Sequence, residues 1–323
     1  MNSSKLLYTG SYVPEQVITN EDISKIVDTD DEWIFSRSGI SRRHIAEKEN
    51  TSDLAAKAAM RILEKGNISP EQIELLIVAT LSGDFATPST ACLVQGKIGA
   101  VNAMAFDINA ACSGFLFGLS MADKYIRSGC YQNALVIGAE VLSKHIDWTD
   151  RSTCVLFADG AAGAYLERCE TGGILAEEMY SNGAKGMCLT GGYVPLVNAF
   201  YQENNDQSRY IHMDGKAVFT FATKVVPPSI LSILNKAKIS PEEIKYIVPH
   251  QANSRIIDIL ARKTKIPADK FYKNMVNYGN TSSASIPIAL NELWEKGMLA
   301  PGDKIVLTGF GGGLTWGSMV VEI

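Results

Sequence analysis

The chain has 323 residues, of which 46% are hydrophobic and 20% are charged, and its formal net charge is −5. This composition is typical of a globular protein with a sizeable core, and the acidic balance argues against a protein whose whole surface binds nucleic acid. No stretch approaches the roughly 20 apolar residues of a membrane span, and the N-terminus lacks the charged and apolar regions of a secretory signal. We therefore expect a cytoplasmic protein that binds neither nucleic acid nor a membrane.

Short apolar runs rich in β-branched residues alternate with helical patterns along the chain. Runs of this kind predict strands that are buried on both faces, and their alternation with helices predicts an α/β fold with largely parallel strand pairing. The predicted strands are residues 75–80, 105–108, 134–137, 155–157, 247–248 and 305–307. The predicted helices are residues 53–65, 114–127, 224–238, 254–263 and 285–296.

An internal repeat indicates a duplicated architecture. The sequence Ile-Ser-Pro-Glu at 68–71 recurs at 239–242, an offset of 171 residues (239 − 68), and both copies precede a predicted strand. Two further segments match in the same register: 134–138 with 305–309, and 105–112 with 276–283. One match of a common helix-start sequence is easily coincidental, but three in one ungapped register indicate duplication. The period is too long for a solenoid, so we expect two similar halves, residues 1–170 and 171–323, that form one compact unit.

The cysteines include no CxxC pair, so we expect no metal site. Without a secretory signal a disulfide framework is also unexpected, and the ordinary interpretation is a set of free, mostly buried thiols. The cysteines are Cys92, Cys112, Cys130, Cys154, Cys169 and Cys188.

Cys112 stands in a setting that favours chemistry. The predicted strand 105–108 runs through small residues into the apolar helix at 114–127. A cysteine at the N-terminus of such a helix meets the positive end of its dipole and free N–H groups, and both favour the thiolate. The local sequence leaves two interpretations open: a nucleophile, or a small core residue at a tight strand–helix junction.

Three other segments lie near strand ends that the repeat makes equivalent, where duplicated halves meet and ligand sites are favoured. His250 follows the strand at 247–248, where sites of α/β proteins lie, but it is also consistent with a satisfied buried histidine. Asn280 lies in a turn before a helix and is equally consistent with a helix cap. The glycines of 309–313 allow close backbone approach and can supply an N–H to an oxyanion.

Seven motifs occur in order along the chain: 28–39 (DTDDEWIFSRSG), 110–115 (AACSGF), 147–151 (DWTDR), 157–161 (FADGA), 249–253 (PHQAN), 278–282 (YGNTS) and 309–317 (GFGGGLTWG). Together they resemble those of β-ketoacyl-acyl-carrier-protein synthase III, and the resemblance runs from about Tyr12 to Trp316. It implies the thiolase fold, five layers αβαβα made of two duplicated βα halves, in agreement with the repeat. It also implies an acyltransferase of fatty acid biosynthesis that acts as a homodimer without a permanently bound cofactor.

The resemblance gives each candidate residue a role in condensation. Cys112 would take the acyl group of a short-chain acyl-CoA and release CoA. His250 and Asn280 would donate hydrogen bonds to the thioester carbonyl of malonyl-acyl-carrier protein while carbon dioxide leaves, and the carbanion would attack the acyl-enzyme to give a β-ketoacyl-carrier protein. The backbone N–H groups of Cys112 and Gly312 would hold the oxyanion.

The resemblance also implies residues that bind the substrates. Trp33 and Arg151 would sandwich the CoA adenine, while Arg37 would contact a phosphate and Asn253 the pantetheine arm. A basic rim would dock the acidic acyl carrier protein, although most of it is equally consistent with a solvated helix face. The rim consists of Arg255, Arg262, Lys263 and Lys265, and the acyl pocket would include Thr87, Phe157 and Phe310.

Three positions depart from the family's pattern. Thr220 replaces a lysine expected near the carrier-protein surface, which puts the docking details in doubt, and Ala158 replaces a glycine. Thr87 stands where some members carry phenylalanine, in a loop that reaches the partner's acyl pocket. A smaller residue would admit a longer or branched primer, unless Phe85 refills the space.

Three other interpretations compete with this one. A relative with the same three residues acts in quinolone, polyketide or olefin pathways, and a requirement for malonyl-carrier protein rather than malonyl-CoA would separate the two. A degradative thiolase uses a second cysteine near the C-terminus, but none follows Cys188. A non-catalytic subunit that binds acyl carrier protein is disfavoured because Cys112, His250 and Asn280 are all present.

Overall fold

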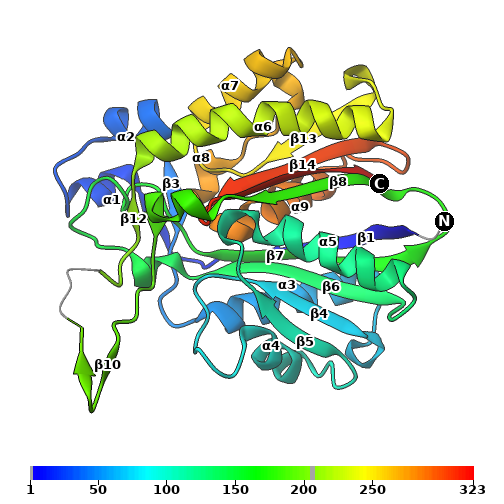
Figure 1. The fold of residues 1–323 in the computed structure, drawn as a ribbon, viewed down its shortest axis with the longest axis horizontal. Helices are drawn as coiled ribbons and strands as arrows, with labels where there is room; N and C mark the ends of the chain where they lie inside the picture. The colour runs from blue at the N-terminus through cyan, green and yellow to red at the C-terminus, as the bar shows by residue number, and fades with distance from the viewer. Residues whose placement is uncertain (1–2, 204–207) are drawn as a thin grey trace.

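The computed structural model of the protein describes residues 3–203 and 208–323. Two β-sheets enclose a central pair of helices, and each sheet carries further helices on its outer face (Figure 1). The order of the layers is therefore αβαβα, which confirms the predicted five-layered α/β fold.

The first sheet comes from the N-terminal part of the chain. Its strands are β1 (Ser3–Tyr12), β4 (Leu75–Ala79), β5 (Met104–Ile108), β6 (Asn133–Glu140) and β7 (Gly160–Cys169). They have the order β1-β7-β6-β4-β5, in which β4 runs parallel to both neighbours and β7 runs antiparallel to both of its own. Strands β4 and β6 are buried along their whole length, since helices cover both faces of the sheet.

The second sheet repeats this plan with one strand fewer. Its strands are β8 (Gly173–Ser181), β13 (Ile244–Pro249), β14 (Lys304–Gly311) and β15 (Thr315–Glu322), in the order β13-β14-β15-β8. Only β13 and β14 are parallel, so the prediction of largely parallel pairing is wrong. The physical reason is plain at β15, which follows β14 after a short turn, and so short a connection permits only antiparallel pairing.

The helices form the other three layers. α5 (Gly114–Arg127) and α9 (Ser285–Glu295) lie between the sheets, where Phe115 and Ile286 join one buried cluster. The outer layers contain α3 (Thr51–Gly66), α4 (Thr90–Ile98), α6 (Gly215–Ala237) and α7 (Ser254–Thr264). The shorter elements are α1 (Asn20–Ser24), α2 (Asp31–Ser38), α8 (Met275–Tyr278), β2 (Val17–Thr19), β3 (Arg42–His44), β9 (Leu189–Thr190), β10 (Val197–Asn198), β11 (Tyr201–Gln202) and β12 (His212–Met213).

α6 corrects one expectation from the sequence. By length and composition alone it is apolar enough to cross a membrane, although the sequence was expected to contain no such stretch. More than half of its most apolar stretch is buried, and the helix packs on β8, β14 and β15. This packing accounts for its apolar character without a membrane.

The 171-residue offset of the sequence reappears in the structure. It carries β6 onto β14 residue for residue, and it carries the 3₁₀ turn Ala111–Ser113 onto the 3₁₀ turn Ser282–Ala284. The first residue of each turn has a left-handed φ, 45° at Ala111 and 50° at Ser282. The match fails at β5, which falls on the helix α8. The division at residues 170 and 171 stays a prediction.

The predicted strand at 155–157 is wrong as well. The segment forms turns, with one isolated bridge between Phe157 and Asn280. Val155 and Phe157 are apolar because they pack in a cluster with Ile23 and Ile34 from α1 and α2, not because they belong to a sheet.

The cysteines are all free thiols, as predicted, but the expectation that most are buried is wrong. Cys112 and Cys154 are buried, whereas Cys92 and Cys130 are exposed. Cys169 and Cys188 are partly exposed.

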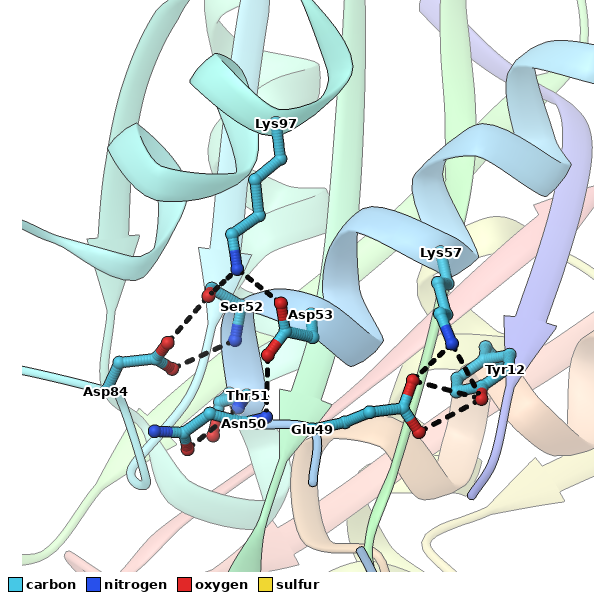
Figure 2. A network of polar contacts seen from close by, with 9 residues as sticks. All are labelled: Tyr12, Glu49, Asn50, Thr51, Ser52, Asp53, Lys57, Asp84 and Lys97. Carbon is cyan, nitrogen blue, oxygen red and sulfur yellow. Dashed lines mark hydrogen bonds and ion pairs between the residues drawn. The ribbon is translucent and has the colours of Figure 1, made fainter. Parts of the chain in front are cut away.

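Polar contacts at the start of α3 anchor the loop that follows β4 (Figure 2). Asp84 in this loop accepts hydrogen bonds from the N–H of Ser52 at 2.9 Å and from its hydroxyl at 2.6 Å. Lys97 on α4 binds the same hydroxyl at 2.7 Å and pairs with Asp53 at 2.5 Å. The start of the loop that carries Thr87 is therefore tied to two helices.

Candidate active site

Cys112 lies at a sharp turn between β5 and α5. The turn is held by Asn109, whose Oδ1 accepts the N–H of Ala111 at 3.2 Å. Cys112 is only 5% exposed. Gly311, at the end of β14, packs against it so closely that a Cβ there would lie 2.7 Å from the Cys112 Cβ and 3.1 Å from its Sγ. A glycine is therefore required where the second sheet meets the cysteine.

A cavity of about 430 Å³ borders Cys112. Gly312 and Ser282 line it beside the cysteine. Several of its other lining side chains are apolar: Leu81, Leu142, Phe157, Leu189 and Ile211. A pocket of this kind can hold an apolar group attached to the sulfur.

Burial dominates the acidity of the Cys112 thiol. It raises the pKa of Cys112 to about 12, while the Ser282 hydroxyl lowers it and the charge of an ionised Glu140 raises it further. This direction is opposite to the one expected from the helix N-terminus, because loss of water disfavours the thiolate more than the nearby donors favour it. The thiol is therefore protonated when no substrate is bound.

Strand β14 connects His250 to the cysteine site, because it contacts both residues. Its backbone N–H donates to the carbonyl of Thr308 at 2.8 Å. Its ring meets Phe310 edge-on at 5.2 Å between centroids, and Phe310 directly precedes Gly311, which packs on Cys112. The end of β14 thus lies between the cysteine and the histidine.

Hydrogen bonds assign the tautomer of His250. Its Nδ1 lies 2.6 Å from the Oγ of Ser285, which also accepts the N–H of Gln251 at 3.4 Å. Within residues 3–203 and 208–323, Nδ1 is the one acceptor in hydrogen-bond reach of the Ser285 hydroxyl. The hydroxyl therefore donates to Nδ1, and the ring proton belongs on Nε2. Burial lowers the pKa of His250 to about 3, which keeps the ring neutral. A neutral imidazole with an Nε2–H donor is the form that the predicted role requires.

Asn280 is held with its amide group ready to donate. Its main chain pairs with the segment 156–158, as its N–H donates to Leu156 at 2.9 Å and its carbonyl accepts from Ala158 at 2.9 Å. Its Oδ1 accepts the N–H of Ser282 at 2.9 Å. The Nδ2 group is therefore the end of the side chain that can donate to a ligand.

Ser282 is a site residue that the sequence analysis did not single out. It is 1% exposed and borders the cavity beside Cys112, whose pKa its hydroxyl lowers. The repeat offered a signal for it, since the offset places it on Ala111, the residue before the cysteine.

The residues predicted to bind CoA cluster on α2 and its neighbours. Arg37 and Arg151 both stack on Trp33, at 4.5 Å and 4.7 Å from the ring centroid, and Arg151 also donates to the carbonyl of Asp28 at 2.7 Å. An adenine fits between Trp33 and Arg151 only after the arginine moves away. Asn253 caps α7 and binds the carbonyl of Arg37 at 2.7 Å, so it links the two helices.

The predicted basic rim is exposed on and after α7, and α6 extends it. Lys263 reaches the carbonyl of Thr223 on α6 at 2.7 Å. Lys216 and Lys224 lie one helical turn before and after Thr220, and all three are exposed. The sequence analysis did not single out these two lysines, which place positive charge on either side of Thr220. The other rim residues are Arg255, Arg262 and Lys265.

The residues predicted for the acyl pocket do not lie together within one chain. Phe157 lines the cavity. Phe310 is 1% exposed and packs on His250 instead, while Thr87 and Phe85 are exposed on the loop after β4 and do not line it.

The fold and this arrangement define a condensing enzyme of the thiolase-fold class, an acyltransferase. The family model "3-Oxoacyl-[acyl-carrier-protein (ACP)] synthase III" matches residues 106–183, and the model of the same family's C-terminal part matches residues 234–323. The chain belongs to the β-ketoacyl-acyl-carrier-protein synthase III family, whose members are condensing enzymes that initiate fatty acid synthesis.

Known relatives match over the full chain. The β-ketoacyl-[acyl-carrier-protein] synthase III of Streptococcus uberis is 53% identical over 325 residues, 100% of both chains. The enzyme of the same name from Clostridium acetobutylicum is 53% identical over 100% of this chain and 99% of its own. The crystal structure of 3-oxoacyl-[acyl-carrier-protein] synthase III from Aquifex aeolicus has a TM-score of 0.93 at 46% identity, and covers 99% of this chain and 100% of that one.

Proposed function

We propose that the protein condenses a short-chain acyl-CoA with malonyl-acyl-carrier protein through an acyl-Cys112 intermediate. The observation that carries this proposal is the contact of Gly311 with Cys112 at the apolar cavity, to which Phe310 joins His250 and Ser282 joins Asn280. The products are a β-ketoacyl-acyl-carrier protein, CoA and carbon dioxide.

The first half-reaction transfers the acyl group. The Cys112 sulfur attacks the thioester carbonyl, its proton leaves with the CoA thiol, and the backbone N–H groups of Cys112 and Gly312 hold the oxyanion. Because burial raises the pKa of Cys112 to about 12, the sulfur must lose its proton during the attack. The acyl chain then occupies the apolar cavity.

The second half-reaction forms the new carbon–carbon bond. Malonyl-acyl-carrier protein loses carbon dioxide, and its thioester becomes an enolate that the Nε2–H of His250 and the Nδ2 group of Asn280 stabilise. The carbanion attacks the acyl carbonyl on Cys112, and the sulfur leaves and recovers a proton. The neutral state of His250 supports this role, since a charged imidazole would need water that the buried site lacks.

Substrate binding and assembly follow the same proposal. Trp33, Arg37, Arg151 and Asn253 bind the CoA moiety, with Arg151 closing on the adenine. No permanently bound cofactor takes part. The protein is cytoplasmic and consists of halves 1–170 and 171–323 in one unit.

We also propose a homodimer, because β5 is an edge strand with no neighbour on its outer side in residues 3–203 and 208–323, and edge strands are commonly covered.

A panel of acyl-CoA primers with malonyl-acyl-carrier protein, read out by product mass, tests the function. We expect products that are two carbons longer than the primer and that carry a β-keto group. Because Thr87 is smaller than the phenylalanine that some family members carry there, we expect four-carbon and branched primers to be accepted at least as well as acetyl-CoA. A strong acetyl preference would refute the wider pocket, and equal use of malonyl-CoA would favour a specialised-metabolite enzyme.

Charge reversal on α6 tests the docking surface. Lys224→Glu is expected to lower kcat/KM for malonyl-acyl-carrier protein by about 10-fold, since the lysine meets an acidic partner, while acylation of Cys112 by acyl-CoA is unchanged. Lys48→Glu changes the net charge equally at an exposed site elsewhere and is the matched control. The same loss in both variants, or none in Lys224→Glu, would exclude α6 from docking.

A further inference from the structure

Glu140 is a fully buried acid behind the proposed active site that the reaction steps above do not use. It ends β6 and has 0% exposure. Its Oε2 accepts hydrogen bonds from the Ser82 hydroxyl at 2.5 Å, the Leu81 N–H at 3.2 Å and the Thr80 hydroxyl at 3.2 Å. Its Oε1 lies 2.9 Å from the Oγ of Ser283.

The partners at Oε2 are all donors. The Ser82 hydroxyl accepts the N–H of Val141 at 3.0 Å, and the Thr80 hydroxyl accepts the N–H of Ser82 at 3.1 Å. Each hydroxyl therefore has its own hydrogen left for Glu140, and the Leu81 N–H can only donate. Oε2 is the acceptor end of the carboxyl group.

The contact at Oε1 favours a proton on Glu140 itself. The Ser283 hydroxyl lies 2.9 Å from Oε1 and also 2.8 Å from the carbonyl of Ala79, which can only accept. Ser283 has one hydroxyl hydrogen, so it cannot donate a full hydrogen bond to both oxygens. When that hydrogen goes to the carbonyl, a proton on Oε1 completes the contact between Glu140 and Ser283. Burial raises the pKa of Glu140, in the direction that this arrangement favours.

The internal repeat shows which residue of the other half is equivalent to Glu140. The 171-residue offset carries Glu140 onto Gly311 and Ser283 onto Cys112. In one half Gly311 leaves the cysteine open to its cavity, whereas in the other half the Glu140 side chain bonds the residue equivalent to the cysteine. The second site of the duplicated pair is thus filled by a hydrogen-bonded acid.

We propose that Glu140 is a neutral carboxylic acid and a positioning residue for the turn that carries Asn280 and Ser282. Its hydrogen bond to Ser283 ties this turn to the loop after β4, beside the nucleophile. Neutrality also matters for the sulfur, because an ionised Glu140 would raise the pKa of Cys112. The positioning role rests on the proposed function of Asn280; the protonation state does not.

Infrared spectroscopy of the folded wild-type protein tests the protonation state without any turnover. We expect the carbonyl band of a protonated carboxylic acid near neutral pH, lost in Glu140→Gln. Asp159→Asn is the matched control, because Asp159 is also a fully buried acid, with 0% exposure. The Glu140 band must survive in this variant. Absence of a band that Glu140→Gln removes would overturn the proposal.

The condensation kinetics of the wild type, Glu140→Gln and Glu140→Ala test the positioning role. A glutamine amide can donate to Ser283 and accept at the Oε2 end, so Glu140→Gln should keep near wild-type condensation. Glu140→Ala should lose up to ~10²-fold in kcat for condensation through misplacement of the turn, with KM for malonyl-acyl-carrier protein unchanged. If Glu140→Gln folds with an unchanged Tm yet falls far below wild type, or if Glu140→Ala folds and keeps full kcat, the role is wrong. If the alanine variant does not fold, Glu140→Gln still decides, since an ionised acceptor would not tolerate the amide.

Discussion

Replacement of Cys112 by alanine is expected to abolish acyl transfer and, with it, condensation, by on the order of 10⁴-fold or more. The physical reason is that the sulfur forms the only covalent bond to the acyl group in the proposed reaction, while the cavity and the oxyanion contacts remain. Wild-type protein incubated with acyl-CoA should gain one acyl mass, which peptide mass spectrometry places on Cys112. The variant should gain none.

Cys154→Ala provides the matched control for this prediction. Cys154 is buried like Cys112, with 1% exposure against 5%, but it packs with residues of α1 and α2 and does not line the cavity. The control should take up the acyl group normally. Undiminished condensation by Cys112→Ala, or an acyl adduct on another residue of the wild type, would show that the nucleophile lies elsewhere.

The sequence predicted best the strands that consist of continuous apolar residues, because such runs indicate burial on both faces. β4, β6, β13 and β14 are continuous apolar runs, and each was expected within a few residues of its observed bounds. β7 was missed because small residues dominate it. A Cβ at Gly163 would lie 2.3 Å from the carbonyl of Val136 on β6, so close packing, rather than hydrophobicity, dictates this sequence.

Some residues of the site could also be predicted from local sequence, and others could not. The sequence pointed to Cys112, His250 and Asn280 because each follows a predicted strand or opens a helix. It gave no sign of Ser285, which fixes the His250 tautomer from 35 residues away, or of Glu140, which meets Ser283 from 143 residues away. The Ser285 contact depends on how α9 packs beside β13 within one half, and the Glu140 contact depends on how the two halves stack. No local pattern encodes either of them.

The local sequence around Cys112 could not predict that its pKa is raised. The helix N-terminus favours the thiolate, and the sequence could predict that effect. It could not predict how completely the C-terminal half covers the sulfur, with Gly311 packed directly against it. Burial then outweighs the helix and raises the pKa to about 12.

Asn280→Ala is expected to separate the two half-reactions. Acylation of Cys112 should proceed, because the oxyanion of that step is held by backbone N–H groups. Condensation should fall by about 10²- to 10³-fold, the usual cost of removing one donor to a developing oxyanion. The measurement is mass spectrometry of the acyl adduct, followed by single-turnover reaction of the acylated enzyme with malonyl-acyl-carrier protein.

Asn280→Asp sharpens this test, because the turn depends on an oxygen and the chemistry on a nitrogen. The aspartate keeps an acceptor for the N–H of Ser282, which Asn280 binds at 2.9 Å, but once it is ionised, at the alkaline end of a pH series, it has no hydrogen to donate. We expect it to fold and acylate normally and, at that end of the series, to lose condensation as severely as the alanine variant. If the aspartate variant condenses at the wild-type rate, or if Asn280→Ala blocks acylation as strongly as condensation, Asn280 does not act as the donor to the enolate.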